Sequence, residues 1–467
     1  MHSKFIAIIF IISLTLLSCS SSNKSFSILM QELPDRINPY DAGIDYKLYV
    51  LKQLFEPLFV YKSDYTYHSN LLSSWSSKDN HQVYDLCLKP DVRFSNNNKL
   101  TIVALKANLL RLQKKGILSK NIYSLETSNS CLSVKFNEPY IRFPFDLSSY
   151  MSSVVDPDTA EKNIVVGVSE YYVKKITPKV IQLSTNNKTL TYSEVLFYKW
   201  AEDNNETNSL YKLDEIDDFN QLPIEFVPEK VKELNVYEVP ALSTVVMLIN
   251  TKDKKVREIV YNCLDYKELR RIFTPKRDDF SDVGGLLPSG IIGAIQQPIS
   301  QKCNFEKLNK RINLRYIEAM RPKSIPVLQQ YVDEKLLKYN IKVNVEYKDI
   351  NALAEVLLSD KKEYDLTIVG MNSYIPDPYG YYQCFYGDHL LMTNVSNAEL
   401  IDSMQKYVAA DTLERKKEFS MKANRSLLSN YQFIPLYQES RRFYFANDIK
   451  NVSSDPLFLN YLKISEL

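Results

Sequence analysis

Glycine is scarce in this sequence, with ten residues among 467. Dinucleotide-binding and phosphate-binding loops need clustered glycines, because their backbone must approach the phosphates closely. The sequence contains no such cluster. It also lacks the Gly-x-Ser-x-Gly and His-Glu-x-x-His motifs of common hydrolases. We therefore expect a protein that is not an enzyme and that carries no cofactor.

Histidine and net charge are also low. Beyond the N-terminal segment the histidines are His68, His81 and His389, and none has another histidine close to it in the sequence. Nickel favours imidazole ligands, so no metal site is predicted from the chain's own side chains. The formal net charge of +2 gives no strong field for nucleic acid, and we expect no nucleic-acid partner.

Cysteine is sparse as well. Apart from Cys19 in the N-terminal segment, the chain contains Cys87, Cys131, Cys263, Cys303 and Cys384. Five is an odd number, so at least one thiol stays free. None lies in a Cys-x-x-Cys pair, and we predict that these residues act mainly as small buried apolar side chains. One disulfide is compatible with an oxidising compartment, but the sequence does not select its partners.

The N-terminal segment has the pattern of an export signal. Lys4 precedes an apolar run over 5–17, which is shorter than the roughly 20 residues that span a bilayer. Such a run is typical of a signal peptide. The following Leu16-Leu17-Ser18-Cys19 is similar to a lipobox, whose cysteine is lipidated and becomes the new N-terminus. We predict a signal peptide over 1–18, lipidation of Cys19, a tether over 19–25 and a membrane-anchored, extracytoplasmic protein. An ordinary signal peptide with an incidental cysteine is the alternative.

Hydrophobic periodicity indicates a mixed α/β chain. With 467 residues, the chain is too long for one core, since domains divide beyond roughly 250–300 residues. Strand patterns over 311–317, 341–347 and 365–369 alternate with helical patterns over 325–337 and 352–358. This order predicts a parallel sheet with right-handed crossovers. Thr101 is a predicted N-cap for a helix through Leu112, and one long helix is expected over 398–428. Separate strands are expected over 434–437 and 443–445.

Short motifs follow one another along the chain in a recognisable order. They are Ile37-Asn38-Pro39-Tyr40, the segments 53–58 and 84–95, Leu248-Ile249-Asn250-Thr251, Pro376-Asp377-Pro378 and the segment 433–437. Together they resemble the family 5 extracytoplasmic solute-binding proteins of oligopeptide, dipeptide and nickel ABC importers. The resemblance covers nearly the whole chain after Cys19.

The resemblance implies a two-lobed, class II flytrap fold with an extra α+β domain inserted in the first lobe. The first lobe is expected over 26–44, 166–250 and 437–467, the extra domain over 45–165 and the second lobe over 251–436. The chain is expected to cross between the lobes near Asn250 and near Tyr437.

The resemblance also implies a function. We expect a monomer that captures short peptides in the cleft between the lobes and delivers them to the transmembrane subunits of an ABC permease. Peptide recognition of this kind reads the backbone by strand addition. The residues expected at the ligand are Asn38, Tyr40, Asp41, Ala42, Gly43, Met371, Asn372, Ser373, Tyr374 and Asp377.

One position departs from the peptide-binding relatives. Where they have an aspartate for the amino group of the ligand, this chain has Tyr374. A phenol carries no charge near neutral pH. Either another carboxylate, such as Asp377 or Asp41, pairs with the amine, or the ligand lacks a conventional N-terminus. For Asp377, a role as the cap of the turn before Pro378 is the alternative.

Two other functions fit the same fold. One is a nickel-chelate or related solute binder. The other is a surface lipoprotein adapted to adhesion or cell-wall sensing.

Overall fold

The computed structural model describes residues 24–30, 32–41, 45–62, 64–118, 120–200, 216–221, 234–274, 280–319, 322–359, 362–373, 375–385, 392–449, 452 and 462–467. All structural statements below concern these residues. The predicted signal peptide, Cys19 and most of the tether lie outside them, as do Ala42, Gly43 and Tyr374.

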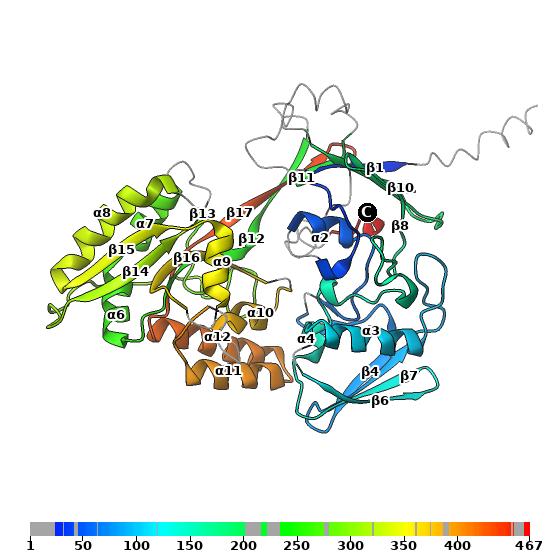
Figure 1. The fold of residues 1–467 in the computed structure, drawn as a ribbon, viewed down its shortest axis with the longest axis horizontal. Helices are drawn as coiled ribbons and strands as arrows, with labels where there is room; N and C mark the ends of the chain where they lie inside the picture. Colours follow the sequence, from blue (N-terminus) through cyan, green and yellow to red (C-terminus); the bar gives the residue numbers. More distant parts are fainter. Residues whose placement is uncertain are drawn as a thin grey trace, which may run out of the picture.

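One large curled sheet organises the chain. Its strands, in spatial order, are β15 (Ile341–Tyr347), β14 (Ile312–Glu318), β16 (Leu366–Asn372), β12 (Leu234–Ile249), β17 (Phe433–Ala446), β11 (Asp218–Gln221), β1 (Ser25–Met30), β10 (Glu194–Lys199), β9 (Val180–Ser184) and β8 (Tyr172–Ile176); β13 (Phe280–Ser281) pairs with β17. The long strands β12 and β17 run from one lobe to the other (Figure 1). The predicted two-lobed α/β flytrap fold is confirmed.

The second lobe contains the predicted parallel unit. β14 pairs in parallel with both β15 and β16, and α8 (Ile325–Leu336) and α9 (Ile350–Leu358) form the crossovers. Successive residues of β12 alternate between two cores. Val245, Met247 and Ile249 face the core that includes α6 (Lys254–Cys263), α7 (Tyr266–Phe273) and α8. Val246 and Leu248 face the other core. Burial on both faces explains the continuous apolar run of this strand.

The first lobe is built around β1, which pairs in parallel with β10 and β11. Its core includes Phe26, Phe197 and Phe443. Helix α2 (Asp45–Leu51) also packs here, because Tyr49 and Leu51 are buried in the same core. The packing thus favours a start of the extra domain after residue 55 rather than at 45. The division into domains remains a prediction.

The extra domain combines a four-stranded antiparallel sheet with one long helix. The sheet has the order β4 (Leu72–Lys78), β5 (Val83–Leu88), β7 (Cys131–Phe136) and β6 (Ile122–Ser128). It packs with α3 (Ile102–Lys114) in a core of its own, and Thr101 caps α3 as predicted. The short hairpin β2 (Val60–Tyr61) and β3 (Tyr67–His68) and the short helix α4 (Phe143–Asp146) complete this domain.

Two local predictions were wrong. The region 398–428 is not one helix but two, α11 (Ala398–Ala409) and α12 (Leu413–Ser429), because the hydroxyl of Thr412 accepts a hydrogen bond from the Arg415 amide and begins a new helix. The strands expected over 434–437 and 443–445 form one strand, β17. Pairing with β12 along most of its length keeps β17 extended through its charged middle.

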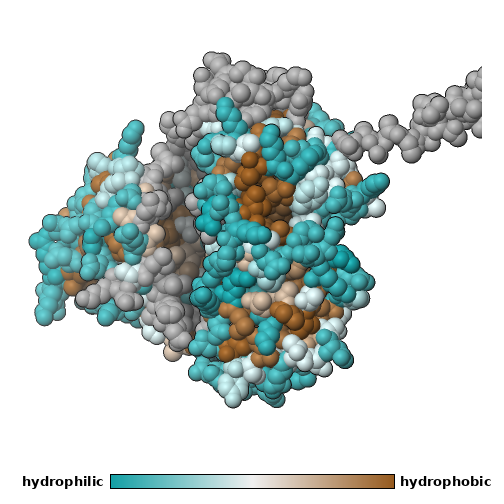
Figure 2. All heavy atoms as spheres, turned by 45° about the vertical axis from the view of Figure 1, so that its right-hand side comes forward, coloured by the Kyte–Doolittle hydropathy of each residue, from teal (hydrophilic) through white to brown (hydrophobic). Residues whose placement is uncertain are grey.

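The face formed by the first lobe and the extra domain is mainly hydrophilic and carries two hydrophobic patches (Figure 2). In the part of the chain that the structure describes, no helix combines the length and the apolar character that a membrane span requires.

The cysteines are mostly paired, so their interpretation as small apolar residues was wrong for four of them. Cys87 bonds to Cys131, which lies directly opposite on the neighbouring strand. Cys263, at the end of α6, bonds to Cys303. Cys384 is free and half-buried. Two disulfides are typical of proteins that fold in an oxidising compartment.

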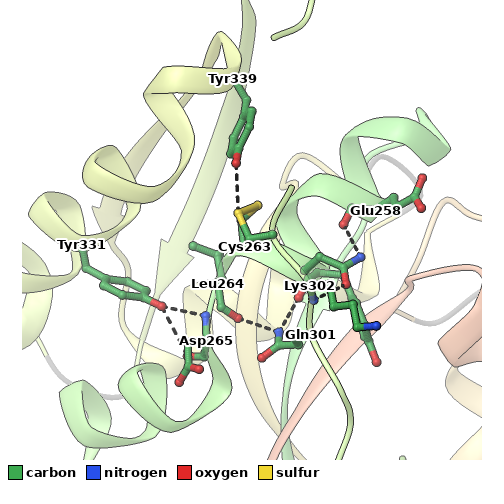
Figure 3. The surroundings of a disulfide bond; sticks show 11 residues. Glu258, Cys263, Leu264, Asp265, Gln301, Lys302, Tyr331 and Tyr339 are labelled. Atoms are coloured by element: carbon green, nitrogen blue, oxygen red, sulfur yellow. Dashed lines mark hydrogen bonds between the residues drawn. A yellow bond between two sulfur atoms is a disulfide. The ribbon is translucent and has the colours of Figure 1, made fainter. Parts of the chain in front are cut away.

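The Cys263–Cys303 disulfide fastens a loop onto the end of α6 (Figure 3). Next to it, the Gln301 side-chain amide donates to the Leu264 carbonyl at 2.8 Å. The Tyr339 hydroxyl lies 3.1 Å from the sulfur of Cys303. The disulfide and a few polar contacts around it therefore hold this loop in position.

We expect Cys303→Ser to destabilise the second lobe. The bond spans a sequence separation of 40 residues, and closing such a loop contributes about 2–4 kcal/mol to the free energy of unfolding. Thermal unfolding of the variant checks this. Cys384→Ala is the matched control, and an equal loss of stability in both variants would contradict the expectation.

Candidate functional site

The predicted ligand segment leaves the sheet at the end of β16. Met371 is 2% exposed and belongs to a core of the second lobe. Gly370 and Asn372 are exposed on the opposite face of the strand, and a Cβ atom at Gly370 would meet nothing within 4 Å. The strand thus presents one open face at Gly370 and Asn372. The side chain of Met371 points into the core instead.

The same strand extends beyond one of its neighbours. β16 pairs with β12 along its whole length, from Leu366 to Asn372. On its other edge it pairs with β14 only at Leu366 and Thr367, among the described residues. The C-terminal part of β16 therefore projects past β14 and ends at Asn372; the next residue, Ser373, is half-buried.

Asp377 is a buried cap. It is 3% exposed, and its Oδ1 accepts a hydrogen bond of 2.8 Å from the Tyr379 amide at the start of α10 (Pro378–Tyr382). Its Oδ2 accepts one of 3.1 Å from the Tyr407 hydroxyl. Burial raises the pKa of the carboxyl group above its usual value. The capping alternative for Asp377 is confirmed, and little of its carboxylate is left for a ligand.

The predicted site residues of the first lobe, Asn38, Tyr40 and Asp41, lie where the first lobe meets the extra domain. Asn38 is 6% exposed, and its side-chain oxygen accepts a hydrogen bond of 3.0 Å from the Tyr40 amide. The Tyr40 ring packs against the cores of the first lobe and of the extra domain, with Lys115 Nζ 5.0 Å from its centroid. Asp41 ends the short helix η1 (Pro39–Asp41).

The structure therefore brings together only part of the predicted set. Met371, Asn372, Ser373 and Asp377 lie within one stretch of the second lobe. In the described part of the chain, no hydrogen bond, ion pair or ring contact joins them to Asn38 or Tyr40. The roles of all these residues toward a ligand remain predictions.

The extra domain contributes residues that the sequence did not indicate. The ring of Phe145 on α4 lies 5.0 Å from that of Tyr379, centroid to centroid. The guanidinium carbon of Arg142 lies 5.1 Å from the centre of the Tyr379 ring. Arg142 also forms an ion pair of 2.8 Å with Asp146. Burial works against the charge of Arg142, but Asp146, Tyr379 and Tyr140 together outweigh it, so the pKa of the guanidinium is raised overall.

Tyrosines of the β2–β3 hairpin approach the same place. The Tyr61 hydroxyl is buried close to Asp377 and to the Tyr407 hydroxyl of the second lobe. Desolvation and the nearby Asp377 and Tyr407 raise its pKa. Tyr61 and Tyr67 lie opposite each other across the hairpin, but no pattern in the sequence marked these tyrosines for a contact with the second lobe.

A cleft that opens and closes needs a hinge, and the sheet has an irregularity where β12 and β17 change lobe. Their pairing register shifts between Pro240 and Thr244 and again between Val245 and Val246. Gln438 is fully buried there. Its amide donates to the Ala241 carbonyl at 2.6 Å and accepts from the Ser289 amide at 2.9 Å. The packing places this crossing earlier in β12 than Asn250.

One cavity among the described residues lies elsewhere. It has a volume of about 580 Å³ and lies between the first lobe and the extra domain. Its wall contains charges of both signs, including Lys52, Glu56, Arg93 and Glu170, and none of the predicted ligand residues. Glu56 is already paired with Lys463.

The described residues contain no cluster of three or more histidine, cysteine, aspartate or glutamate side chains that could hold a metal ion. The His68 imidazole is paired with Asp64 at 3.0 Å. The His81 imidazole lies 3.3 Å from the Tyr84 hydroxyl. His389 lies outside the described residues.

Comparison with known proteins gives a consistent result. Residues 66–389 match the model of the bacterial extracellular solute-binding proteins, family 5. The chain is 23% identical over 390 residues to the nickel-binding protein NikA of Staphylococcus aureus, covering 79% of this chain and 74% of NikA.

Solved structures share the fold. The Bacillus subtilis oligopeptide-binding protein AppA, in complex with a nonapeptide, has a TM-score of 0.67 at 15% identity, with 95% of this chain and 98% of AppA covered. The Escherichia coli murein tripeptide binding protein MppA has a TM-score of 0.66 at 14% identity, with 94% and 96% covered. Staphylococcus aureus NikA, in complex with Ni(L-His)2, has a TM-score of 0.63 at 18% identity, with 93% and 97% covered.

The burial of Asp377 predicts a pH effect on stability. Its folded pKa is raised, so the folded protein holds this proton more tightly than the unfolded chain does. The wild type should lose stability relative to Asp377→Asn as the pH rises above about 4, and the difference should level off above the raised pKa. Thermal unfolding of both proteins across this range checks the sign.

The variant Asp377→Ala tests the contribution of the capping hydrogen bonds separately from that of the charge. It leaves the Tyr379 amide and the Tyr407 hydroxyl without their acceptor, which should cost about 1–3 kcal/mol. The asparagine variant keeps an acceptor and should lose less. Equal stability of the alanine variant and the wild type would show that the cap contributes nothing.

Proposed function

Because the chain belongs to family 5 of the bacterial extracellular solute-binding proteins, which serve ABC importers, we propose that it captures short peptides between its lobes. It then delivers them to the transmembrane subunits of a permease. We further propose that it acts as a monomer on the outer side of the membrane, held there by lipid on Cys19.

The observation that carries the peptide proposal is the projecting part of β16. Peptide binding by strand addition needs a strand edge with unused backbone groups beside open space. The edge of β16 beyond Thr367 has no strand partner on the β14 side among the described residues. Gly370 and Asn372 are exposed beside it. An extended backbone could pair there without any particular side-chain sequence.

The electrostatics favour a ligand whose end at this segment is not a free amine. An ammonium group buried without a counter-charge is costly. Asp377 is a buried cap that accepts from Tyr379 and Tyr407, and Tyr374 supplies no charge. Arg142 lies nearby and its side chain is 30% exposed, but it is already paired with Asp146. We therefore propose that N-terminally blocked peptides, or peptides bound in the opposite direction, are accepted as well as free ones.

The hinge supports closure around the ligand. β12 and β17 carry the chain between the lobes, and their pairing is interrupted between Pro240 and Thr244. Lobes joined through two strands can rotate about the interruption while each keeps its own core.

The proposal predicts the outcome of a ligand panel. Thermal unfolding is measured with free di-, tri- and pentapeptides, their N-acetylated forms and a murein tripeptide. A ligand at 100 times its Kd adds about 2.7 kcal/mol to stability, and free and acetylated forms of one peptide should raise the midpoint to a similar extent.

Other results of the panel have clear meanings. Stabilisation by free peptides alone would show that a carboxylate pairs with the amine and would overturn the proposed polarity. If no peptide shifts the midpoint, the peptide proposal fails, and a surface lipoprotein adapted to adhesion or sensing takes its place.

A second candidate, a nickel-chelate binder, is favoured by the similarity to NikA. Because the described residues contain no cluster that could hold a metal, nickel would have to arrive as a complete chelate. We expect that nickel with histidine would then raise the unfolding midpoint and that nickel alone would not. Stabilisation by nickel alone would point to protein ligands outside the described residues.

A further inference from the structure

The extra domain is fixed to the first lobe. Glu56 and Lys463 form a partly buried ion pair, and the Asn70 side chain donates to Glu56 at 2.6 Å. The Asn108 side chain, from α3, donates at 2.7 Å to the carbonyl of Val155, whose side chain is buried in the core of the first lobe. A contact between the extra domain and the second lobe is therefore a contact between the two halves of the flytrap.

The β2–β3 hairpin makes such a contact. At its tip, the Tyr65 hydroxyl donates to the Gly290 carbonyl of the second lobe at 3.2 Å. In return, Lys416 Nζ of α12 donates to the Tyr65 carbonyl at 3.1 Å. The ring of Tyr65 packs on a core of the second lobe. One residue thus carries two hydrogen bonds and an apolar contact across the junction.

The tip is built rigidly. Tyr65 has a φ of 61°, in the left-handed region that tyrosine rarely adopts. The turn is held by Asp64, whose carboxylate accepts from the Thr66 amide at 3.0 Å and from the Thr66 hydroxyl at 2.7 Å. A residue kept in a sparsely populated conformation suggests a role in its contacts.

A second contact lies beside the first. Phe145 and Arg142 of the extra domain lie against Tyr379 of the second lobe. Gly380 makes this closeness possible, since a Cβ atom there would lie 3.3 Å from the Phe145 ring and 1.9 Å from Ser373 Oγ. The two contacts lie near the end of β16, next to the predicted ligand segment.

We propose that the β2–β3 hairpin is a latch, in which Tyr65 engages Gly290 and Lys416 and holds the second lobe in the closed position. The latch consists of protein groups alone, so it stabilises closure in addition to any contact that a ligand makes. Its consequence for ligand capture rests on the proposed function. A latched cleft must open before a ligand enters, so a weaker latch speeds association and lowers affinity.

The hydrogen bonds are partly exposed, so each contributes modestly, by about a two- to tenfold change in the ratio of closed to open molecules. A contribution of this size suits a latch that must release.

Single-molecule energy transfer tests the latch without any ligand. Dyes are placed at Tyr123→Cys, 72% exposed on the extra domain, and at Val327→Cys, 57% exposed on the second lobe. The whole mature chain is used in detergent, with Cys384→Ala to remove the free thiol. We expect a main population with high transfer.

Two mild variants break one hydrogen bond each. Tyr65→Phe removes the hydroxyl and Lys416→Met removes the amine. Each should move the closed-to-open ratio about two- to tenfold toward open, and the double variant should move it further. Lys422→Met, an exposed lysine of the same helix, is the matched control and should leave the ratio unchanged.

The proposal is overturned if the parent protein shows no high-transfer population, or if both variants stay within the change seen for Lys422→Met. Unfolding midpoints of all variants verify that they are folded. Because no peptide or nickel is added, failure of the ligand panel leaves this result untouched, and failure of the latch leaves the peptide proposal standing.

Discussion

The pairing of β12 with β17 is the constraint on which the rest of the structure depends. The two strands are paired at both ends, with Leu234 opposite Ala446 in the first lobe and Leu248 opposite Phe433 in the second. Each lobe builds its core on its own end of this ribbon. The interrupted middle, beginning at Pro240, which has no backbone N–H to donate, joins two rigid bodies without merging them. Gln438 bonds to the Ala241 carbonyl in this interruption and to the Ser289 amide of a neighbouring loop.

Beside this ribbon, the predicted ligand segment of the second lobe contains polar groups but few unpaired charges. Asp377 follows β16 along the chain, but burial raises the pKa of its carboxyl group and its oxygens accept from Tyr379 and Tyr407. Arg142 approaches from the extra domain already paired with Asp146. Under the proposed function, recognition there relies more on backbone groups and shape than on ion pairing.

The extra domain connects binding to movement. It is fastened to the first lobe through Glu56 and Lys463, and it touches the second lobe through Tyr65 and Phe145. The extra domain therefore links the first lobe to the second lobe. A substitution that weakens the contacts of Tyr65 or Phe145 changes the balance between open and closed forms, even when it lies far from the ligand.

The sequence by itself determined the fold class, the parallel unit of the second lobe and the cap at Thr101, because these follow from local periodicity and from motifs in order along the chain. It did not determine the disulfides, since Cys87 and Cys131, or Cys263 and Cys303, become neighbours only when distant strands and loops pack. It left open whether Asp377 binds a ligand or caps a helix, because that depends on the burial supplied by Tyr407, 30 residues away along the chain. It gave no sign that Arg142, Phe145 and Tyr65 would meet the second lobe. Such contacts arise from how regions with separate hydrophobic cores pack together, and no local pattern of residues records that arrangement.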